Sequence, residues 1–124
     1  MIKVMVVDDE TDVEILFKQQ FRKEVKQGLL ELCYAFSGDE ALTALTSVQP
    51  PDIVCILSDI NMPGMTGLEL LKIVKDRYPH IRVSMITAYG DENNLKTALS
   101  TGAEHYFTKP IDFLQVKKDV FNFA

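Results

Sequence analysis

The hydrophobic positions of this chain fall into two alternating patterns. Runs rich in apolar residues occupy 2–7, 29–36, 53–57, 82–87 and 105–108, and between these runs apolar residues recur every three or four positions. The first pattern is typical of strands buried in a parallel sheet, whereas the second is typical of amphipathic helices. The alternation predicts an α/β fold with a three-layer, doubly wound, five-stranded parallel sheet.

Polar and small residues predict where the helices between these strands begin and end. Capping boxes, in which a Thr or Ser and a Glu three residues later bond each other's backbone N–H groups, are expected at Thr11–Glu14, Ser37–Glu40 and Thr66–Glu69. Two later helices are expected from about Asp91 to Ser100 and from near Asp112, and helices should stop before Gly28, Pro50, Pro79 and Gly102. The predicted inner faces are Val13, Leu16, Phe17, Phe21 and Val25; Ala41, Leu42, Leu45 and Val48; Leu68, Leu71 and Val74; and Phe113, Val116, Val120 and Phe121.

The composition limits the classes of protein that the chain can represent. With 124 residues and 47% hydrophobic content, it is expected to form one domain over residues 1–124. No apolar stretch is long enough for a signal peptide or a membrane span, so we expect a cytoplasmic protein without membrane contact. The net charge of -5 argues against direct nucleic-acid binding by this chain. Cys33 and Cys55 lie within apolar runs and are expected to be lone thiols without chemical function.

Polar side chains at the carboxyl ends of the predicted strands supply the candidate chemistry. These residues are Asp8 and Asp9, Asp59, Thr87 and Lys109. Ligands of doubly wound sheets bind at this edge, and a flavodoxin-like strand order of 2-1-3-4-5 would place Asp8, Asp9 and Asp59 together. Carboxylates so close either raise one another's pKa or bind a cation, and an all-oxygen site favours Mg²⁺ or Mn²⁺.

Each of these residues has an ordinary interpretation when it is taken alone. Acids before a helix are usually solvated partners of the helix dipole, Thr87 is a common strand-end hydroxyl, and Lys109 precedes a proline turn. Tyr106 is more typical of a core aromatic residue, and His105 of a surface or packing residue. The joint placement of the acids, the hydroxyl and the ammonium group at one edge of one sheet favours a shared function.

Asp59 is the expected nucleophile of this site. It ends the most buried strand and precedes the Met62-Pro63-Gly64 turn, which would hold the adjacent loop open. An aspartate that attacks phosphorus forms an acyl phosphate, and cationic charge must offset the two anions that meet. A metal ion and Lys109 would supply that charge.

Four motifs give the chain a resemblance to a known family. They are VVDDE at 6–10, SDINMPGMTGLELL at 58–71, ITAYG at 86–90 and HYFTKP at 105–110. In this order and at these strand ends, they resemble the receiver domain of two-component response regulators, the CheY-like family. The resemblance covers essentially the whole chain.

The resemblance implies a role for each residue of the site. Asp59 would accept a phosphoryl group, while Asp9, Asp59 and the backbone carbonyl of Asn61 would bind Mg²⁺, with Asp8 assisting through water. Thr87 and Lys109 would hold the phosphoryl oxygens, and the Lys109–Pro110 peptide bond would be cis. Asn61 and Tyr89 would flank the approach of water to the phosphorus atom.

The resemblance also implies a signalling switch with protein partners. A sensor histidine kinase or a small phosphodonor would phosphorylate Asp59, Thr87 would move toward the phosphoryl group, and Tyr106 would rotate inward. This change would reshape the face formed by the helix at 91–100, the strand at 105–108 and the last helix, where an output domain, a downstream protein or a second copy would bind. Parts of the sequence resemble receivers that precede nucleotide cyclases and other signalling enzymes more than receivers fused to DNA-binding modules.

A second hypothesis is a Mg²⁺-dependent phosphohydrolase with an aspartyl nucleophile. Such an enzyme would need a cap or insertion over its substrate and usually a second acid two residues after the nucleophile. Here that position is Asn61, and no loop is long enough for a cap. The two hypotheses differ in whether the protein turns over a phosphate ester or takes up one phosphoryl group.

Overall fold

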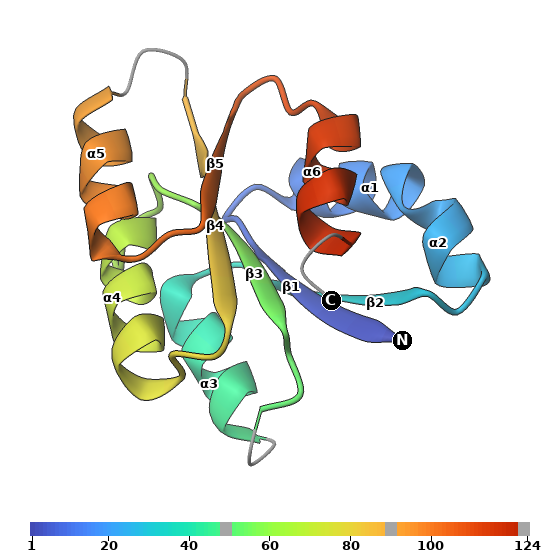
Figure 1. The fold of residues 1–124 in the computed structure, drawn as a ribbon, viewed down its shortest axis with the longest axis horizontal. Helices are drawn as coiled ribbons and strands as arrows, with labels where there is room; N and C mark the ends of the chain where they lie inside the picture. The colour runs from blue at the N-terminus through green and yellow to red at the C-terminus, as the bar shows by residue number, and fades with distance from the viewer. Residues whose placement is uncertain (48–50, 89–91, 122–124) are drawn as a thin grey trace.

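The computed structural model describes residues 1–47, 51–88 and 92–121, and these form a layer of strands between two layers of helices (Figure 1). The strands are β1 (Ile2–Val7), β2 (Leu30–Ala35), β3 (Cys55–Asp59), β4 (Arg82–Thr87) and β5 (His105–Thr108). The helices are α1 (Thr11–Gln20), α2 (Arg22–Lys26), α3 (Gly38–Ser47), α4 (Gly67–Arg77), α5 (Glu92–Thr101) and α6 (Phe113–Phe121). The predicted α/β class is confirmed.

All strands belong to one parallel sheet in the order β2-β1-β3-β4-β5. This is the predicted flavodoxin-like order. It leaves β2 at one edge of the sheet and β5 at the other, with β1, β3 and β4 between them (Figure 1). Because the strands are parallel, their carboxyl ends meet at a single edge, where the polar residues identified in the sequence must gather.

Alternate residues of β1 enter two separate hydrophobic cores. Met5 and Val7 belong to the core under α3, α4 and α5, whereas Val4 and Val6 belong to the core under α1 and α6. The alternation follows from the two-residue side-chain period of a strand. β3 is buried along its whole length. It is therefore a central strand covered on both faces, as its continuous apolar run predicted.

The first predicted helix is broken in the structure. α1 ends at Gln20 and α2 begins at Arg22, with Phe21 between them at φ -102° and ψ 9°. The prediction that Leu16 and Val25 lie on the inner face is wrong, since these side chains are 38% and 44% exposed. The break changes the helical phase before Val25, and Phe21 takes the inner position at the break, where it is fully buried.

The predicted capping box at the start of α1 is also wrong. Glu10, not Thr11, occupies the N-cap position, and its side chain makes no capping hydrogen bond. The backbone N–H of Glu10 instead donates to Oδ1 of Asp8 at 2.9 Å. The tertiary position of Asp8 at the end of β1 therefore decides how the chain enters the helix.

The predicted caps of α3 and α4 agree more closely with the structure. The Thr66–Glu69 box is confirmed, with both reciprocal hydrogen bonds present. At the start of α3, the Ser37 hydroxyl accepts a hydrogen bond from the Glu40 backbone N–H at 3.1 Å. A cap depends on residues within one turn, so the sequence can predict it wherever no tertiary contact competes.

Several predicted boundaries shift by one or two residues. β2 is shorter by one residue at each end than the predicted 29–36, and β3 begins at Cys55 instead of Ile53. Leu42 and Leu68 are only partly buried, whereas Leu70, which was not predicted, is fully buried. Val48 and Asp91 lie outside the described residues. Within the described ranges, no helix is long and apolar enough to cross a membrane.

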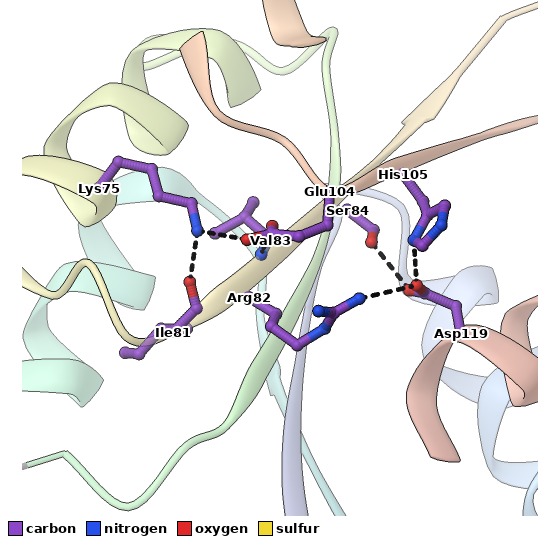
Figure 2. Close-up of polar contacts among 8 residues, drawn as sticks. All are labelled: Lys75, Ile81, Arg82, Val83, Ser84, Glu104, His105 and Asp119. Carbon is purple, nitrogen blue, oxygen red and sulfur yellow. Dashed lines mark hydrogen bonds and ion pairs between the residues drawn. The ribbon is translucent and has the colours of Figure 1, made fainter. Parts of the chain in front are cut away.

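Two groups of polar contacts link the strands β4 and β5 to helices on opposite sides (Figure 2). On α6, the buried Asp119 carboxylate accepts a hydrogen bond from the Ser84 hydroxyl at 2.8 Å and contacts Nδ1 of His105. On α4, the Lys75 ammonium group donates to Glu104 at 2.6 Å. His105 is an exposed residue, in agreement with the expectation of a surface or packing role, but its acidic partner on α6 could not be predicted from the sequence.

Candidate functional site

The pairing of β1 with β3 places two acidic residues side by side. Val7 is registered with Ser58, so Asp8, directly after β1, and Asp59, the last residue of β3, lie at the same level. Ligand atoms of Asp8, Asp9 and Asp59 all lie within 4.8 Å of one another. The cluster predicted from the strand order is therefore present.

Burial makes this cluster electrostatically costly without a cation. Asp8 is 3% exposed and Asp59 is 6% exposed, whereas Asp9 faces solvent. Burial raises the pKa of Asp8 above its usual value, although the hydrogen bond from the Glu10 N–H and the charge of Lys109 each lower it. Burial, followed by the nearby Asp8 charge, raises the pKa of Asp59. Both carboxyl groups thus lie where a positive charge would stabilise their ionised forms.

Lys109 brings a cation to the same point from the end of β5. Its Nζ lies 3.6 Å from Oδ2 of Asp59 and 3.8 Å from Oδ2 of Asp8. The backbone N–H of Lys109 donates to the carbonyl of Thr87 at 2.9 Å, which fixes the loop against β4. The peptide bond between Lys109 and Pro110 is cis, as the family resemblance implied.

The remaining predicted site residues occupy the same edge of the sheet or its flank. Thr87 ends β4 and is almost fully buried, one residue beyond the partner of Asp59 in the β3–β4 register. Asn61 is exposed on the loop after β3, and its backbone makes a hydrogen bond that counters the rise in the pKa of Asp59. Tyr106 on β5 is 42% exposed. Tyr89 lies outside the described residues.

The loop between β3 and α4 passes very close to Asp59. Gly64 adopts φ +74°, a conformation that favours glycine, directly after Pro63. A Cβ atom at Gly67 would lie 2.1 Å from the carbonyl oxygen of Asp59 and 2.8 Å from Cα of Ile60. The backbone N–H of Gly67 donates to the Ile60 carbonyl at 2.8 Å. Only glycine allows this close approach, which holds the loop beside the carboxylates.

The donors in the cluster fit a hard divalent cation. All are carboxylate oxygens, which Mg²⁺ and Mn²⁺ prefer, and a neighbouring backbone carbonyl at Asn61 could add another. Oδ2 of Asp8 is buried and has no hydrogen-bond partner among the residues that the structure describes, although buried polar atoms normally have one. The Lys109 ammonium group, at 3.8 Å from this atom, is beyond hydrogen-bond length. The buried oxygen is therefore available to a cation or to a water molecule bound to one.

The cysteines take no part in this site. Both are free thiols. Burial raises the pKa of Cys55 to about 12 and also raises the pKa of Cys33. A thiol with a raised pKa is a poor nucleophile at neutral pH.

A doubly wound sheet with acids and a lysine at its carboxyl edge defines a class of α/β proteins that bind cations and phosphate groups. A family model described as the response regulator receiver domain matches residues 4–121. The chain therefore belongs to the receiver domain family of two-component response regulators. Its function is that of a phosphorylation-activated signalling switch, and receiver domains of this kind act between histidine kinases and output domains.

Relatives and solved structures agree with this assignment. The chain is 36% identical over 118 residues to sporulation initiation phosphotransferase F of Bacillus subtilis, covering 95% of this chain and 90% of that protein. A receiver domain structure from Clostridium thermocellum superimposes with a TM-score of 0.88 at 27% identity, over 98% of this chain and 93% of that one. The response regulator TrrA of Thermotoga maritima, solved in complex with Mg²⁺-BeF, has a TM-score of 0.81 at 27% identity over the full length of both chains.

Longer regulators share the same domain. The chain is 41% identical over 110 residues to the DNA-binding transcriptional regulator NtrC of Proteus hauseri, covering 88% of this chain. It spans only 22% of that protein's length. The DNA-binding function in that name therefore belongs to a protein much longer than this chain.

Proposed function

We propose that Asp59 accepts the phosphoryl group and that residues 1–124 form one receiver domain. The observation that supports this assignment is the position of Asp59 within a cluster of three carboxylates, with the Lys109 ammonium group 3.6 Å from its Oδ2. Asp8 is buried to a similar extent, but the Lys109 ammonium group lies farther from its Oδ2, at 3.8 Å, and Asp9 faces solvent. Asp59 also adjoins the loop that Gly67 holds against β3.

Phosphorylation forms one bond and breaks one bond. A carboxylate oxygen of Asp59 attacks the phosphorus atom, and the bond from phosphorus to the donor's nitrogen or acyl oxygen breaks, with its electron pair leaving on the donor. The product is an acyl phosphate. Lys109 would offset the charge on the phosphoryl oxygens, and the Thr87 hydroxyl would donate a hydrogen bond to one of them.

A divalent cation, Mg²⁺ or Mn²⁺, would be held by Asp9, Asp59 and the backbone carbonyl of Asn61, with Asp8 assisting through water. Three carboxylates within 4.8 Å and the unpartnered buried oxygen of Asp8 support this site. When bound, the cation supplies positive charge that reduces the repulsion between Asp59 and an incoming phosphoryl group.

Magnesium is expected to raise the melting temperature of the wild-type domain. Only the folded chain gathers the carboxylates, so a concentration of about 100 times Kd would stabilise it by about 2.7 kcal/mol. Asp9→Ala is expected to abolish most of this rise, because it removes a ligand from an exposed position without disturbing the core. Differential scanning fluorimetry with and without Mg²⁺ measures the effect.

A matched control for this experiment is Asp12→Ala. Asp12 is also an exposed acid and lies in the first turn of α1, outside the cluster. Its variant should keep the wild-type response to Mg²⁺. An equal Mg²⁺ response in Asp9→Ala and wild type would exclude Asp9 as a ligand.

The response to phosphorylation would pass to the face formed by α5, β5 and α6. Tyr106 of β5 is 42% exposed, and the two helices of this face carry the exposed Leu99 on α5 and Leu114 on α6. Movement of Thr87 toward the phosphoryl group would leave room for Tyr106 to turn inward and change this surface. An output domain, a downstream protein or a second copy of the phosphorylated chain would bind there.

The partners follow from the same proposal. A sensor histidine kinase, or a small phosphodonor, would supply the phosphoryl group. The relative NtrC is described as a DNA-binding transcriptional regulator. One structural neighbour is a putative two-component system response regulator/GGDEF domain protein, and this chain covers 47% of its length. This chain itself, with a net charge of -5, would act through protein contacts and not by binding nucleic acid.

The stoichiometry of the reaction distinguishes a switch from a phosphohydrolase. With acetyl phosphate and Mg²⁺, the protein is expected to gain one acid-labile phosphoryl group, followed by intact-mass spectrometry. With a phosphate ester such as p-nitrophenyl phosphate, it is expected to release no more product than a sample without protein. Sustained turnover of the ester would instead support the phosphohydrolase hypothesis.

A further inference from the structure

The outer edge of β2 carries backbone groups that face away from the sheet. β2 is the terminal strand and pairs only with β1 within the described sheet. The hydrogen bond from the Ile2 N–H to the Leu29 carbonyl, 3.2 Å long, fixes the phase of this parallel ladder. Alternate residues then bond to β1, so Leu30, Leu32 and Tyr34 direct their N–H and C=O groups outward.

A groove lies along this same edge, bordered by β2, α1 and α2. Its volume is about 740 Å³, and its apolar lining includes Val25, Leu30, Leu32 and the ring of Tyr34. Figure 1 shows α2 beside β2 at this edge of the molecule. We call this feature the β2 groove. It combines apolar side chains with free backbone groups of an edge strand, which is the combination that binds extended peptides.

The Tyr34 side chain lines the β2 groove and ends in a buried hydroxyl group. Among the residues that the structure describes, none forms a hydrogen bond with this hydroxyl oxygen. Burial raises the pKa of Tyr34 to about 12, so the group is a protonated donor at neutral pH. Buried hydroxyls normally form hydrogen bonds, and this one would gain a bond only if a bound ligand displaced the atoms that cover it.

The rim of the β2 groove is cationic in a chain that is acidic overall. The residues that line the groove include three basic side chains, Lys18, Arg22 and Lys26, and one acidic side chain, Glu31. The chain as a whole has a net charge of -5. In the described part of the chain, Arg22 and Lys26 form no ion pair and are exposed. Lys18 is 3.8 Å from Glu14 and lies 5.6 Å from the Tyr34 ring centroid. Two of the three cations are therefore free to meet an anionic ligand.

The charges decide which occupant the β2 groove fits. A second copy that paired along β2 would bring the same three cations against their counterparts, which opposes such a dimer. An acidic segment meets no such repulsion. We propose that the β2 groove binds an extended acidic peptide segment of a partner protein, which adds to the sheet as a strand beside β2.

The geometry of an added strand specifies the pattern of the peptide. Its side chains alternate between the two faces of the sheet, so every second residue faces α1 and α2. This set should contain an apolar residue that packs on Leu32 and acidic residues that form ion pairs with Arg22 and Lys26. The other set faces α3, where Asp39 and Glu40 are exposed, so it should not be acidic.

A synthetic peptide of about seven residues, the length of an ordinary strand, tests this pattern. The matched peptide has a central valine, a glutamate two residues away on each side and threonine elsewhere. A control peptide of the same composition places the glutamates directly beside the valine, which moves the acids to the other face. Fluorescence anisotropy is expected to give at least about tenfold tighter binding for the matched peptide. Binding should also weaken as salt is raised.

Amide hydrogen exchange measured by NMR tests the strand addition itself. The matched peptide should slow exchange at Leu32 and Tyr34, whose N–H groups point outward. Glu31 and Cys33 already donate to β1 and should change little. Equal protection at all four residues, or at none, would contradict pairing along this edge.

Charge reversal on α2 tests the cationic rim. Arg22→Glu should weaken binding of the matched peptide about tenfold. Lys23→Glu is the matched control, because Lys23 is exposed on the same helix and does not line the β2 groove. Asp59→Asn should bind the peptide as wild type does, so this result is independent of the proposed phosphorylation site. No measurable binding by wild type, equal effects of the two reversals, or self-association through this edge instead would overturn the proposal.

Discussion

Asp59→Asn is expected to reduce phosphoryl uptake from one equivalent per chain to a level below detection. An amide oxygen is uncharged and is a much weaker nucleophile than a carboxylate oxygen, although the two groups have the same shape. The measurement is intact-mass spectrometry after incubation with acetyl phosphate and Mg²⁺, with and without acid treatment. Uptake that persists in this variant, or that needs no divalent ion, would show that another residue is modified.

The stability of the same variant separates a missing nucleophile from a misfolded protein. Burial and the charge of Asp8 raise the pKa of Asp59 in the folded chain. A carboxyl group with a raised folded-state pKa destabilises the folded state progressively as pH rises above its ordinary value of 3.8. Asp59→Asn removes this cost, so without metal at neutral pH it should melt at or above the wild-type temperature.

Asp8→Asn is the matched control for the phosphorylation experiment. It removes a buried carboxylate from the same cluster, about as deeply buried as Asp59. Because the nucleophile remains, it should slow uptake but still reach one equivalent at long times. Complete loss of uptake in both variants would mean that the cluster acts as a unit and would leave the nucleophile unassigned.

Gly67→Ala is expected to lower the free energy of unfolding by about 1 to 3 kcal/mol, the usual cost of forcing atoms into packed space. The added Cβ would lie 2.1 Å from the carbonyl oxygen of Asp59 and 2.8 Å from Cα of Ile60. Both neighbours are backbone atoms, so the β3–α4 loop must move as a unit. Urea denaturation followed by circular dichroism measures the loss, and the rate of phosphoryl uptake should fall with it.

Gly38→Ala provides the comparison for this variant. A Cβ atom there would also be too close to a neighbour, at 2.6 Å, but that neighbour is the sulfur of the Met65 side chain. A methionine side chain can change rotamer at low cost, so this variant should be much less destabilised. If both variants lose the same stability, the close contact with Asp59 is not what requires glycine at position 67.

The candidate site could be predicted from the sequence because its residues are tied to strand ends. Asp8, Asp59 and Lys109 each follow an apolar run, and the topology of a doubly wound sheet brings such positions to one edge. The sequence also carried the Thr66–Glu69 capping box, whose two hydrogen bonds form within one helical turn. In these cases local sequence and global fold favour the same structure.

Predictions failed where a distant contact changed a local preference. Thr11 did not cap α1, because the carboxylate of Asp8 at the end of β1 holds the Glu10 N–H instead. Val25 left the inner face, because the helix breaks at Phe21. The helical spacing of apolar residues in the sequence does not predict where such a break occurs.

The sequence by itself determined the class of fold, the expected flavodoxin-like strand order and the identity of the clustered acids. Only the tertiary structure decided how deeply Asp8 and Asp59 are buried, how close Lys109 lies to both, and that Asp119 on α6 meets Ser84 and His105. The same holds for the β2 groove, which joins residues of α1, α2 and β2. Residue periodicity records which side of an element faces the core, whereas burial, distances and grooves arise from how separate elements pack together.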